Sequence, residues 1–393
     1  MAARCDRPEH PNPLFQRETW MNLNGPWQFA ICPEKLQFPP RWEGTLQAPF
    51  CLQSPLSGAL DQLSAERKMH LGLHGPPLAP GLPKRKALWY AKSLVLPAEW
   101  SLEGSEVWLH VGACDSYAEV MVNGRSCGTH LGGNTPFSLN ITSALRSDGT
   151  DGEVKINIKC TDSSSVDKPA GKQLCRPGIY KGKGNLGTLY SNITGIWQTV
   201  WLEARSQQHL AGLQMVAKLE ELDQWHLELQ AEVATKAGET VELVATLFTD
   251  RSCRDPICQS STSVNDAKNV ALQLLVPQKE TKLWCPENPH LYGLQLHLQN
   301  QRGEMVDRVT SYAALRSVTC HGDQICLNGN PTFLRLVLDQ GYYPDAWILL
   351  SQGPGMIFSK NPPVKWRIYR IYRNCTRIKL LVIPSHTSII FNM

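Results

Sequence analysis

Apolar and polar residues alternate with a period of two along much of the first 316 residues. The alternation is clear in residues 154–158, 225–233 and 292–298, and it is typical of β-strands that bury one face. Residues 241–248 form a more continuous apolar strand. Asn-Gly pairs, which favour the tight turns of β-hairpins, stand at 24–25, 123–124 and 328–329 and predict a hairpin at each place. The pattern therefore predicts an all-β chain.

The alternation divides this part of the chain into two domains. Residues 1–205 form one β-rich domain, within which the Pro- and Gly-rich stretch 33–86 is predicted to be loop. Residues 206–316 form a second all-β unit. Its length of about 110 residues suits an immunoglobulin-like sandwich.

The last part of the chain has a different pattern. Within residues 317–347, an Asn-Gly hairpin leads into Phe333–Leu338, which is apolar on both faces and is typical of a strand in a parallel sheet. From residue 348 on, Gly-Pro-Gly and Pro-Pro sequences interrupt every pattern. We therefore expect residues 348–393 to form an irregular, disordered tail.

Composition and charge exclude two classes of protein. Hydrophobic residues make up 42% of the chain and charged residues 19%, which excludes an intrinsically disordered protein. The net charge of +4 comes from the tail, because seven basic and no acidic residues follow Asp345, while the rest holds 32 of the 39 basic residues against all 35 acidic ones. A nucleic-acid-binding domain needs a basic folded surface, so we expect no nucleic-acid partner.

Cysteine usage and hydropathy indicate a cytoplasmic protein outside the membrane. The chain has 13 Cys, an odd number without Cys-x-x-Cys spacing, which favours reduced thiols over disulfides or a zinc site. Met1–Asp6 is polar, so we expect no signal peptide. No apolar run approaches the roughly 18 residues of a membrane span.

A series of segments resembles the motifs of glycoside hydrolase family 2, which includes β-galactosidases, β-glucuronidases and β-mannosidases. The segments are Leu23–Phe29, Val122–Gly124, Gly132–Phe137, Gly195–Glu203, Trp284–Tyr292 and Leu327–Arg335. A single Asn-Gly match is weak, but the ordered series is specific.

The resemblance implies a fold. It implies a jelly-roll sugar-binding domain in residues 1–205, an immunoglobulin-like domain in residues 206–316 and the opening strand of a (β/α)8 catalytic barrel in residues 317–347. A barrel needs about 200–250 residues, and fewer than about 50 follow residue 347. We therefore expect a chain that is truncated at the start of its barrel.

The resemblance also implies an activity, the hydrolysis of O-glycosyl bonds with retention. That reaction needs an acid/base and a nucleophilic glutamate about 5–5.5 Å apart. Both belong to later barrel strands, and no Asp or Glu follows Asp345. We therefore assign no catalytic residue and expect an inactive family member. The alternative is a non-enzymatic β-sandwich protein that binds carbohydrate or a partner, with self-association through Phe333–Leu338 as one route.

In the family, the loop before Gly195 comes close to the active site, which implies candidate substrate-binding residues. Together with the carboxylates nearest to the missing cleft, the candidates are Lys172, Gln173, Asn192, Asp339 and Asp345. Trp197 and Trp201 belong to the same motif, but a role in the core explains them more simply.

Other chemistry is not indicated. His70 and His74 have the spacing of metal ligands on a helix, but Gly72 and Gly75 predict a loop, so we expect no metal site. Gly182–Gly184 lacks the strand and helix that frame a phosphate-binding loop. We expect no cofactor.

Overall fold

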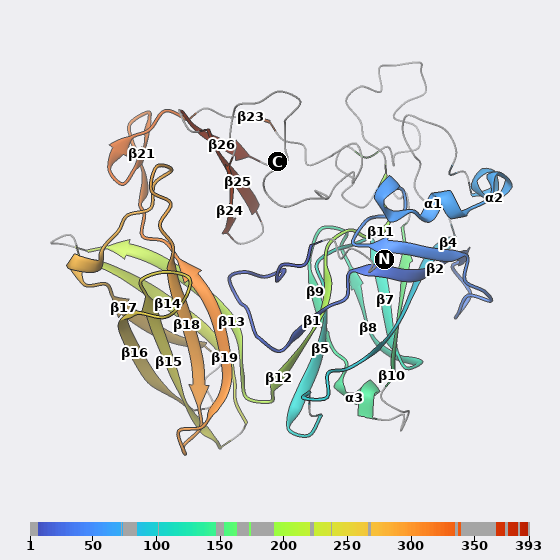
Figure 1. Ribbon diagram of the computed structural model, residues 1–393, viewed down its shortest axis with the longest axis horizontal. Helices are drawn as coiled ribbons and strands as arrows, with labels where there is room; N and C mark the ends of the chain where they lie inside the picture. Colours follow the sequence, from blue (N-terminus) through green and yellow to red (C-terminus); the bar gives the residue numbers. More distant parts are fainter. Residues whose placement is uncertain are drawn as a thin grey trace. The chain divides into compact units, whose positions relative to one another are not determined.

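The computed structural model describes residues 7–71, 73, 85–100, 102–146, 153–162, 173, 192–220, 224–236, 238–265 and 269–334, and by backbone alone 337–338, 367–373, 376–383 and 386–391. Most of these residues lie in antiparallel strands, and the helices are short (Figure 1). The chain divides into two compact units, unit 1 built mainly from Trp20–Ala204 and unit 2 mainly from Arg205–Asp339. The fold is all-β, as the alternation predicted.

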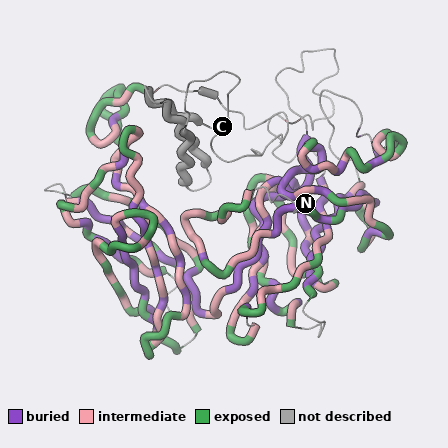
Figure 2. Tube along the Cα trace, in the orientation of Figure 1, coloured by how far each residue is buried: buried purple, intermediate pink, exposed green. Residues whose placement is uncertain are grey.

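Unit 1 is a jelly roll of two main sheets with the strand orders β3-β2-β4-β10-β7-β8 and β1-β12-β5-β9, and a short pair, β11-β6. The strands are β1 Trp20–Asn22, β2 Gly25–Pro33, β3 Gly44–Ala48, β4 Lys86–Val95, β5 Ser105–Val111, β6 Cys114–Asp115, β7 Tyr117–Val122, β8 Arg125–Leu131, β9 Phe137–Asn140, β10 Glu153–Thr161, β11 Gly195–Ile196 and β12 Val200–Ser206. One hydrophobic core joins the two main sheets (Figure 2). In it Trp27 meets Tyr90 edge to face, with ring centroids 6.3 Å apart.

Unit 2 is a seven-stranded immunoglobulin-like sandwich with the orders β13-β14-β17 and β16-β15-β18-β19. Its strands are β13 His209–Leu219, β14 Trp225–Ala234, β15 Thr240–Phe248, β16 Pro256–Asn265, β17 Asn269–Leu275, β18 Tyr292–Gln299 and β19 Met305–Ala313. From Leu227 to the end of β14 and from Leu294 to the end of β18, buried positions alternate with half-buried or exposed ones. The period of two in the sequence therefore corresponds to the two faces of each strand.

An N-terminal segment, His10–Thr19, belongs to unit 2 rather than to unit 1. Gln16 and Thr310 exchange two backbone hydrogen bonds of 2.9 and 2.8 Å, so the segment adds to the β19 edge of the sandwich. Arg17 pairs with Asp307 inside this unit. Nothing in the sequence pattern indicated that these residues serve the second domain.

Two of the three Asn-Gly hairpins are confirmed. Asn123 and Gly124 join β7 to β8, and Asn328 and Gly329 join β21 Gln324–Leu327 to β22 Asn330–Pro331. All four residues have positive φ, as a type I′ turn requires. The third strand of this small sheet is β20 Val318–His321.

The hairpin predicted at 24–25 is wrong. Strand β1 pairs with β12 and β2 pairs with β3 and β4, so this turn carries the chain from one sheet to the other. The Asn24 side chain accepts a 3.2 Å hydrogen bond from Val200 N and donates one of 3.2 Å to Thr199 Oγ1. These long-range contacts outweigh the local preference for a hairpin.

The stretch 33–86, predicted to be loop, contains regular elements as well. They are β3, a 3₁₀ turn Pro55–Ser57, α1 Ala59–Gln62 and α2 Ala65–His70. Ser64 caps α2 by accepting a 3.0 Å hydrogen bond from Arg67 N, and Leu63 and Leu71 anchor its two ends in the core. His70 is therefore the last residue of a helix, although Gly72 and Gly75 predicted a loop here. The other helical elements are α3 Thr142–Arg146 and the 3₁₀ turn Gln278–Glu280, and no helix within the described ranges is long and apolar enough to cross a membrane.

The irregular tail that we expected contains three strands. They are β24 Arg367–Arg373, β25 Thr376–Ile383 and β26 His386–Phe391, in one sheet with β23 Val337–Leu338. Isoleucine occurs six times and tyrosine twice in them, and both residues favour extended backbone. Strand β23 pairs in parallel with β26, while Phe333 is 82% exposed, so Phe333–Leu338 is not buried along its whole length. Self-association through this segment stays a prediction.

Candidate functional site

Five polar residues gather in unit 1 where β6 and β10 end and β11 begins. We call them the Asp115 cluster, and they are Gln53, Asp115, Asp162, Gln173 and Thr194. Four of them are at most 7% exposed. A buried polar group is costly unless it is hydrogen-bonded, so the contacts within the cluster decide whether it can exist.

Gln173 links the first half of the cluster. Strand β6 pairs with β11, so Asp115 lies opposite Gly195. The Gln173 side chain donates from Nε2 to Asp115 Oδ2 over 3.3 Å and accepts at Oε1 from Ile193 N over 2.9 Å. One amide therefore ties the β6 carboxylate to the backbone just before β11.

Thr194 links the second half. Its hydroxyl donates to Asp162 Oδ2 over 2.8 Å and accepts from Gln53 Nε2 over 2.9 Å. Its backbone N donates to Gln53 Oε1 over 2.9 Å, and its carbonyl accepts from Leu52 N over 3.1 Å. Each polar group of Thr194 therefore has a partner.

A glycine and a tryptophan fix the neighbouring turn. A Cβ on Gly133 would lie 2.5 Å from Asp115 Oδ1, so only glycine fits beside this carboxylate. The Trp197 indole donates to the Gly133 carbonyl over 2.7 Å, and Trp197 packs with Cys51, Ala113 and Ile193 in a small apolar cluster. The backbone at Gly133 is therefore positioned by Asp115 and by Trp197.

The cluster closes the stretch between β10 and β11. Asp162 and Thr194 flank residues 163–193, of which the structure describes Gln173, Asn192 and Ile193. Both ends and one interior point of the stretch are therefore tied to the jelly roll. The Asp115 carboxylate accepts a hydrogen bond from the Gln173 amide, and the Asp162 carboxylate accepts one from the Thr194 hydroxyl. These hydrogen bonds stabilise the buried carboxylates and position the backbone of the stretch.

The thiols near the cluster are not nucleophiles. Burial raises the pKa of Cys51 to about 12. The adjacent Cys114 thiol, together with burial, raises the pKa of Cys160 well above its usual value. Both thiols stay protonated at neutral pH, and a protonated thiol is a poor nucleophile. In the parts of the chain that the structure describes, no group of three His, Cys, Asp or Glu could hold a metal ion.

The structure places some of the candidate residues and not others. Gln173 lies in the cluster, and Asn192, two positions before Thr194, is buried at 6% exposure. Trp197 and Trp201 are buried, as a core role requires. Outside the described residues lie Lys172, Asp339 and Asp345.

Four residues of the cluster were missed. Gln53, Asp115, Asp162 and Thr194 are isolated in the sequence, and Gln53 is 141 positions from Thr194. The available signal was a carboxylate placed directly after the apolar strand that ends at Thr161. A carboxylate after a strand is common, and its position in the sequence does not predict which residues it will bond.

Replacing Gly133 tests the rigidity of the cluster. We expect Gly133→Ala to lower the free energy of unfolding by about 1–3 kcal/mol, because the new Cβ must displace the Asp115 carboxylate from Gln173. Gly212→Ala in β13 is the control, since its Cβ would lie 3.3 Å from the movable end of Glu232. Urea unfolding followed by tryptophan fluorescence measures the free energy of unfolding of both variants. Equal losses of stability would contradict the predicted clash at Gly133.

Two family models match the chain. One is described as "Glycosyl hydrolases family 2, sugar binding domain" and matches residues 20–202, and the other, "Glycosyl hydrolases family 2", matches residues 208–316. Together they cover well over half of the sequence. The chain belongs to glycosyl hydrolases family 2. The two matched segments of this family 2 chain correspond to the jelly roll and the immunoglobulin-like sandwich described above.

Curated family 2 relatives agree with this assignment. A β-galactosidase of Thermoanaerobacter pseudethanolicus is 23% identical over 250 residues, which cover 63% of this chain and 31% of that protein. The β-glucuronidase of Homo sapiens is 25% identical over 260 residues, which cover 63% of this chain and 38% of that protein. The chain thus spans about a third of the length of these relatives.

Solved structures share the fold. A β-glucuronidase from Ruminococcus gnavus superposes with a TM-score of 0.60 at 18% identity, over 85% of this chain and 53% of that chain. A β-glucuronidase from Bacteroides uniformis superposes with a TM-score of 0.59 at 22% identity, over 84% of this chain and 36% of that chain.

Proposed function

We propose that this family 2 chain binds carbohydrate at the end of its jelly roll where the Asp115 cluster lies, and that residues 1–393 alone do not hydrolyse it. The observation that carries the proposal is the cluster itself, which fixes both ends and Gln173 of the stretch before β11. Binding residues are most effective when their support is rigid, because little conformational freedom is then lost on binding.

Gln173 and Asn192 are the proposed contacts among the described residues. Sugar hydroxyls need groups that both donate and accept hydrogen bonds, and an amide can donate two and accept two. The Gln173 amide bonds Asp115 Oδ2 and Ile193 N, so a sugar hydroxyl would share its Nε2 or Oε1 with these partners. The same proposal extends to Lys172, Asp339 and Asp345 on the basis of the motifs alone. The names of the relatives suggest a β-galactoside or a β-glucuronide as the sugar.

The absence of turnover follows from the chemistry that retention needs. Two carboxyl groups must flank the glycosidic bond about 5–5.5 Å apart. The two matched segments are the sugar-binding and the immunoglobulin-like domains, and no acidic residue follows Asp345. Binding that is equal in the ground state and the transition state gives no rate enhancement.

We further propose that the chain functions in the cytoplasm. The ten cysteines in the part that the structure describes are all free thiols, and nine of them are buried or half-buried on separate strands and turns. Free thiols without disulfides suit a reducing compartment.

A binding experiment tests the proposal. The 393-residue protein is titrated calorimetrically with methyl β-D-galactopyranoside and methyl β-D-glucuronide. We expect Gln173→Ala to weaken the binding of at least one of them about fivefold or more, the effect of one or two hydrogen bonds. Gln28→Ala, at an exposed position of β2, is the matched control and should bind as the unaltered protein does.

Two outcomes would contradict the proposal. The first is an affinity unchanged by Gln173→Ala. The second is turnover of aryl β-galactosides, β-glucuronides or β-mannosides that disappears when Asp339 and Asp345 are both changed to Asn, because it would place a working active site at the opening of the barrel.

A further inference from the structure

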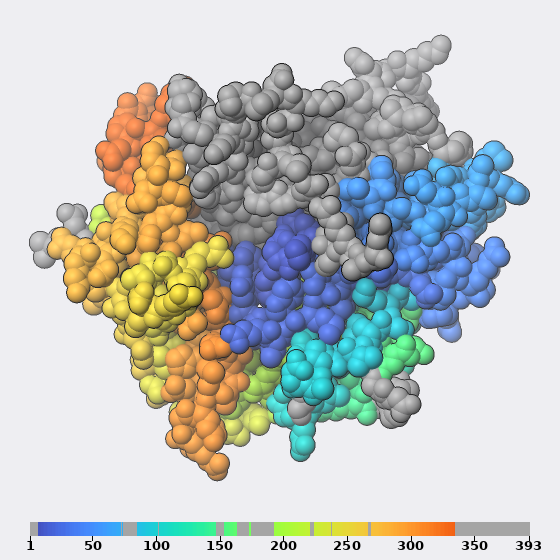
Figure 3. Space-filling view, viewed as in Figure 1, coloured from blue at the N-terminus to red at the C-terminus, as the bar shows by residue number. Residues whose placement is uncertain are grey.

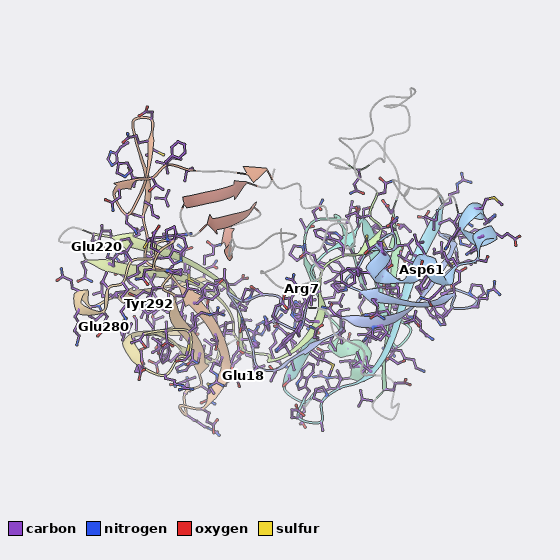
Figure 4. All side chains as sticks on the ribbon, turned by 45° about the horizontal axis from the view of Figure 1, so that its top comes forward. Arg7, Glu18, Asp61, Glu220, Glu280 and Tyr292 are labelled. Carbon is purple, nitrogen blue, oxygen red and sulfur yellow. The ribbon has the colours of Figure 1, made fainter. Side chains whose placement is uncertain are left out.

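A pocket lies in another part of unit 1. It has a volume of about 720 Å³ and is formed by the residues before β3 and by the α1–α2 stretch. Pockets that bind small molecules usually have about 300–1,000 Å³. It shares no residue with the Asp115 cluster. Figure 3 shows this part of the chain, in light blue, at the surface of the molecule, and Asp61 of α1 marks it in Figure 4.

The walls of the pocket are held in place by polar contacts. Arg67 donates from Nε to Glu43 Oε1 over 2.6 Å, and Glu43 Oε2 accepts from Ile31 N over 2.7 Å, so α2 is tied to β2. The Gln62 side chain accepts from Thr45 N over 2.9 Å and donates to the Gly58 carbonyl over 2.8 Å, so α1 is tied to β3. The pocket is therefore formed before any ligand arrives.

An aromatic ring in the wall is oriented in the same way. Trp42 lines the pocket and meets Phe38 edge to face, with ring centroids 5.9 Å apart. Phe38 also contacts Trp89 at 5.5 Å, and Trp89 is buried in a small core with Trp42 packed against it. Phe38 and the small core therefore fix the orientation of the Trp42 ring. Met69, 65% exposed, adds a second apolar surface to the lining.

Polar groups remain available at the rim. Arg41 and Glu66 are exposed and line the pocket, and within the described residues neither side chain has a hydrogen-bond partner. One is a donor and the other an acceptor. With Arg67 and Glu43 included, the lining holds two guanidinium groups against two carboxylates, so the pocket has no strong preference for an ion of either sign.

We propose that this pocket is a second carbohydrate site, which binds a neutral sugar ring. The C–H face of such a ring fits an aromatic or thioether surface, and its hydroxyls both donate and accept hydrogen bonds, which Arg41 and Glu66 can satisfy together. A sugar acid gains from Arg41 but is opposed by Glu66. The inference goes beyond the proposed function because it involves other residues and another part of the jelly roll.

Ligand-observed saturation-transfer NMR and calorimetry on the 393-residue protein test the inference. The probes are methyl β-D-glucopyranoside, methyl β-D-galactopyranoside and, as the anionic comparison, methyl β-D-glucuronide. We expect Arg41→Ala and Glu66→Gln each to weaken binding of a neutral glycoside about fivefold or more. To reduce the contribution of the first site, these variants are also measured in the Gln173→Ala background.

Trp42→Ala should weaken binding further, but Trp42 is half-buried, so circular dichroism must first show that this variant is folded. If the Trp42→Ala variant is not folded, Arg41→Ala and Glu66→Gln still test the inference, because they change exposed side chains. Gln28→Ala is again the control and should leave binding unchanged.

The two sites give distinguishable results. Binding that is unaffected by Arg41→Ala and Glu66→Gln but lost with Gln173→Ala would overturn this inference and support the proposed function. The reverse result would support the inference and overturn the proposed function. No transfer to either neutral glycoside at about 10 mM in the unaltered protein, or preferential binding of the glucuronide at Arg41, would also overturn the inference.

Discussion

Asp307→Ala should lower the free energy of unfolding of unit 2 by about 3–5 kcal/mol, because it leaves a buried guanidinium without its carboxylate. Arg17 donates to Asp307 from Nε over 3.0 Å and from Nη2 over 2.9 Å, and the two side chains are 3% and 6% exposed. Asp307 also accepts from Leu210 N over 2.8 Å, and Arg17 donates to the Leu210 carbonyl. The pair therefore joins the N-terminal segment, β13 and β19.

Differential scanning calorimetry measures this effect as a fall of about 10–20 °C in the melting temperature of unit 2. Arg308→Ala is a close control, because Arg308 follows Asp307 on β19 and pairs with Glu18 of the same N-terminal segment over 2.6 Å. That pair is exposed (36% and 80%; Glu18 is labelled in Figure 4), so its loss should cost at most about 1 kcal/mol. If both variants cost the same, the buried pair does not anchor the segment.

His209 should make unit 2 sensitive to acid. This side chain is 6% exposed, and its pKa is lowered to about 4 by burial first and then by Arg205 and Arg17. In the unfolded chain a histidine takes up a proton below about pH 6.5. Between pH 6.5 and 4 the unfolded state therefore binds the proton and the folded state does not, so stability is present above that window and falls as the pH falls through it.

The expected loss from this one group is about 2 kcal/mol at pH 5 relative to pH 7.5. His209→Gln keeps a donor for the Ser206 carbonyl, which Nδ1 contacts over 2.9 Å, and removes the titration. Urea unfolding from pH 7.5 to 5 should show a smaller loss in this variant than in the unaltered protein. The control is His321→Gln, which removes a histidine at an exposed position of β20 in the same unit. A parallel fall in all three proteins would refute the role of His209.

Local patterns determined the fold class of this protein. The alternation in β10, β14 and β18 predicted strands because a period of two places one set of side chains on one face, wherever that face later packs. The turns at 123–124 and 328–329 were predicted because Asn and Gly tolerate positive φ without help from the rest of the chain. The order of the family motifs was likewise readable from the sequence alone.

Long-range contacts decided the rest. The turn at 24–25 has the same local chemistry as the other two, but its neighbouring strands pair with β12 and β4, so tertiary pairing sent them to different sheets. The Asp115 cluster and the Arg17–Asp307 pair join residues 141 and 290 positions apart, and no period or spacing encodes such partners. The alternation determines locally which face of a strand is buried. The group that bonds a buried charge comes from a distant part of the sequence, so its identity is decided only when the sheets have assembled.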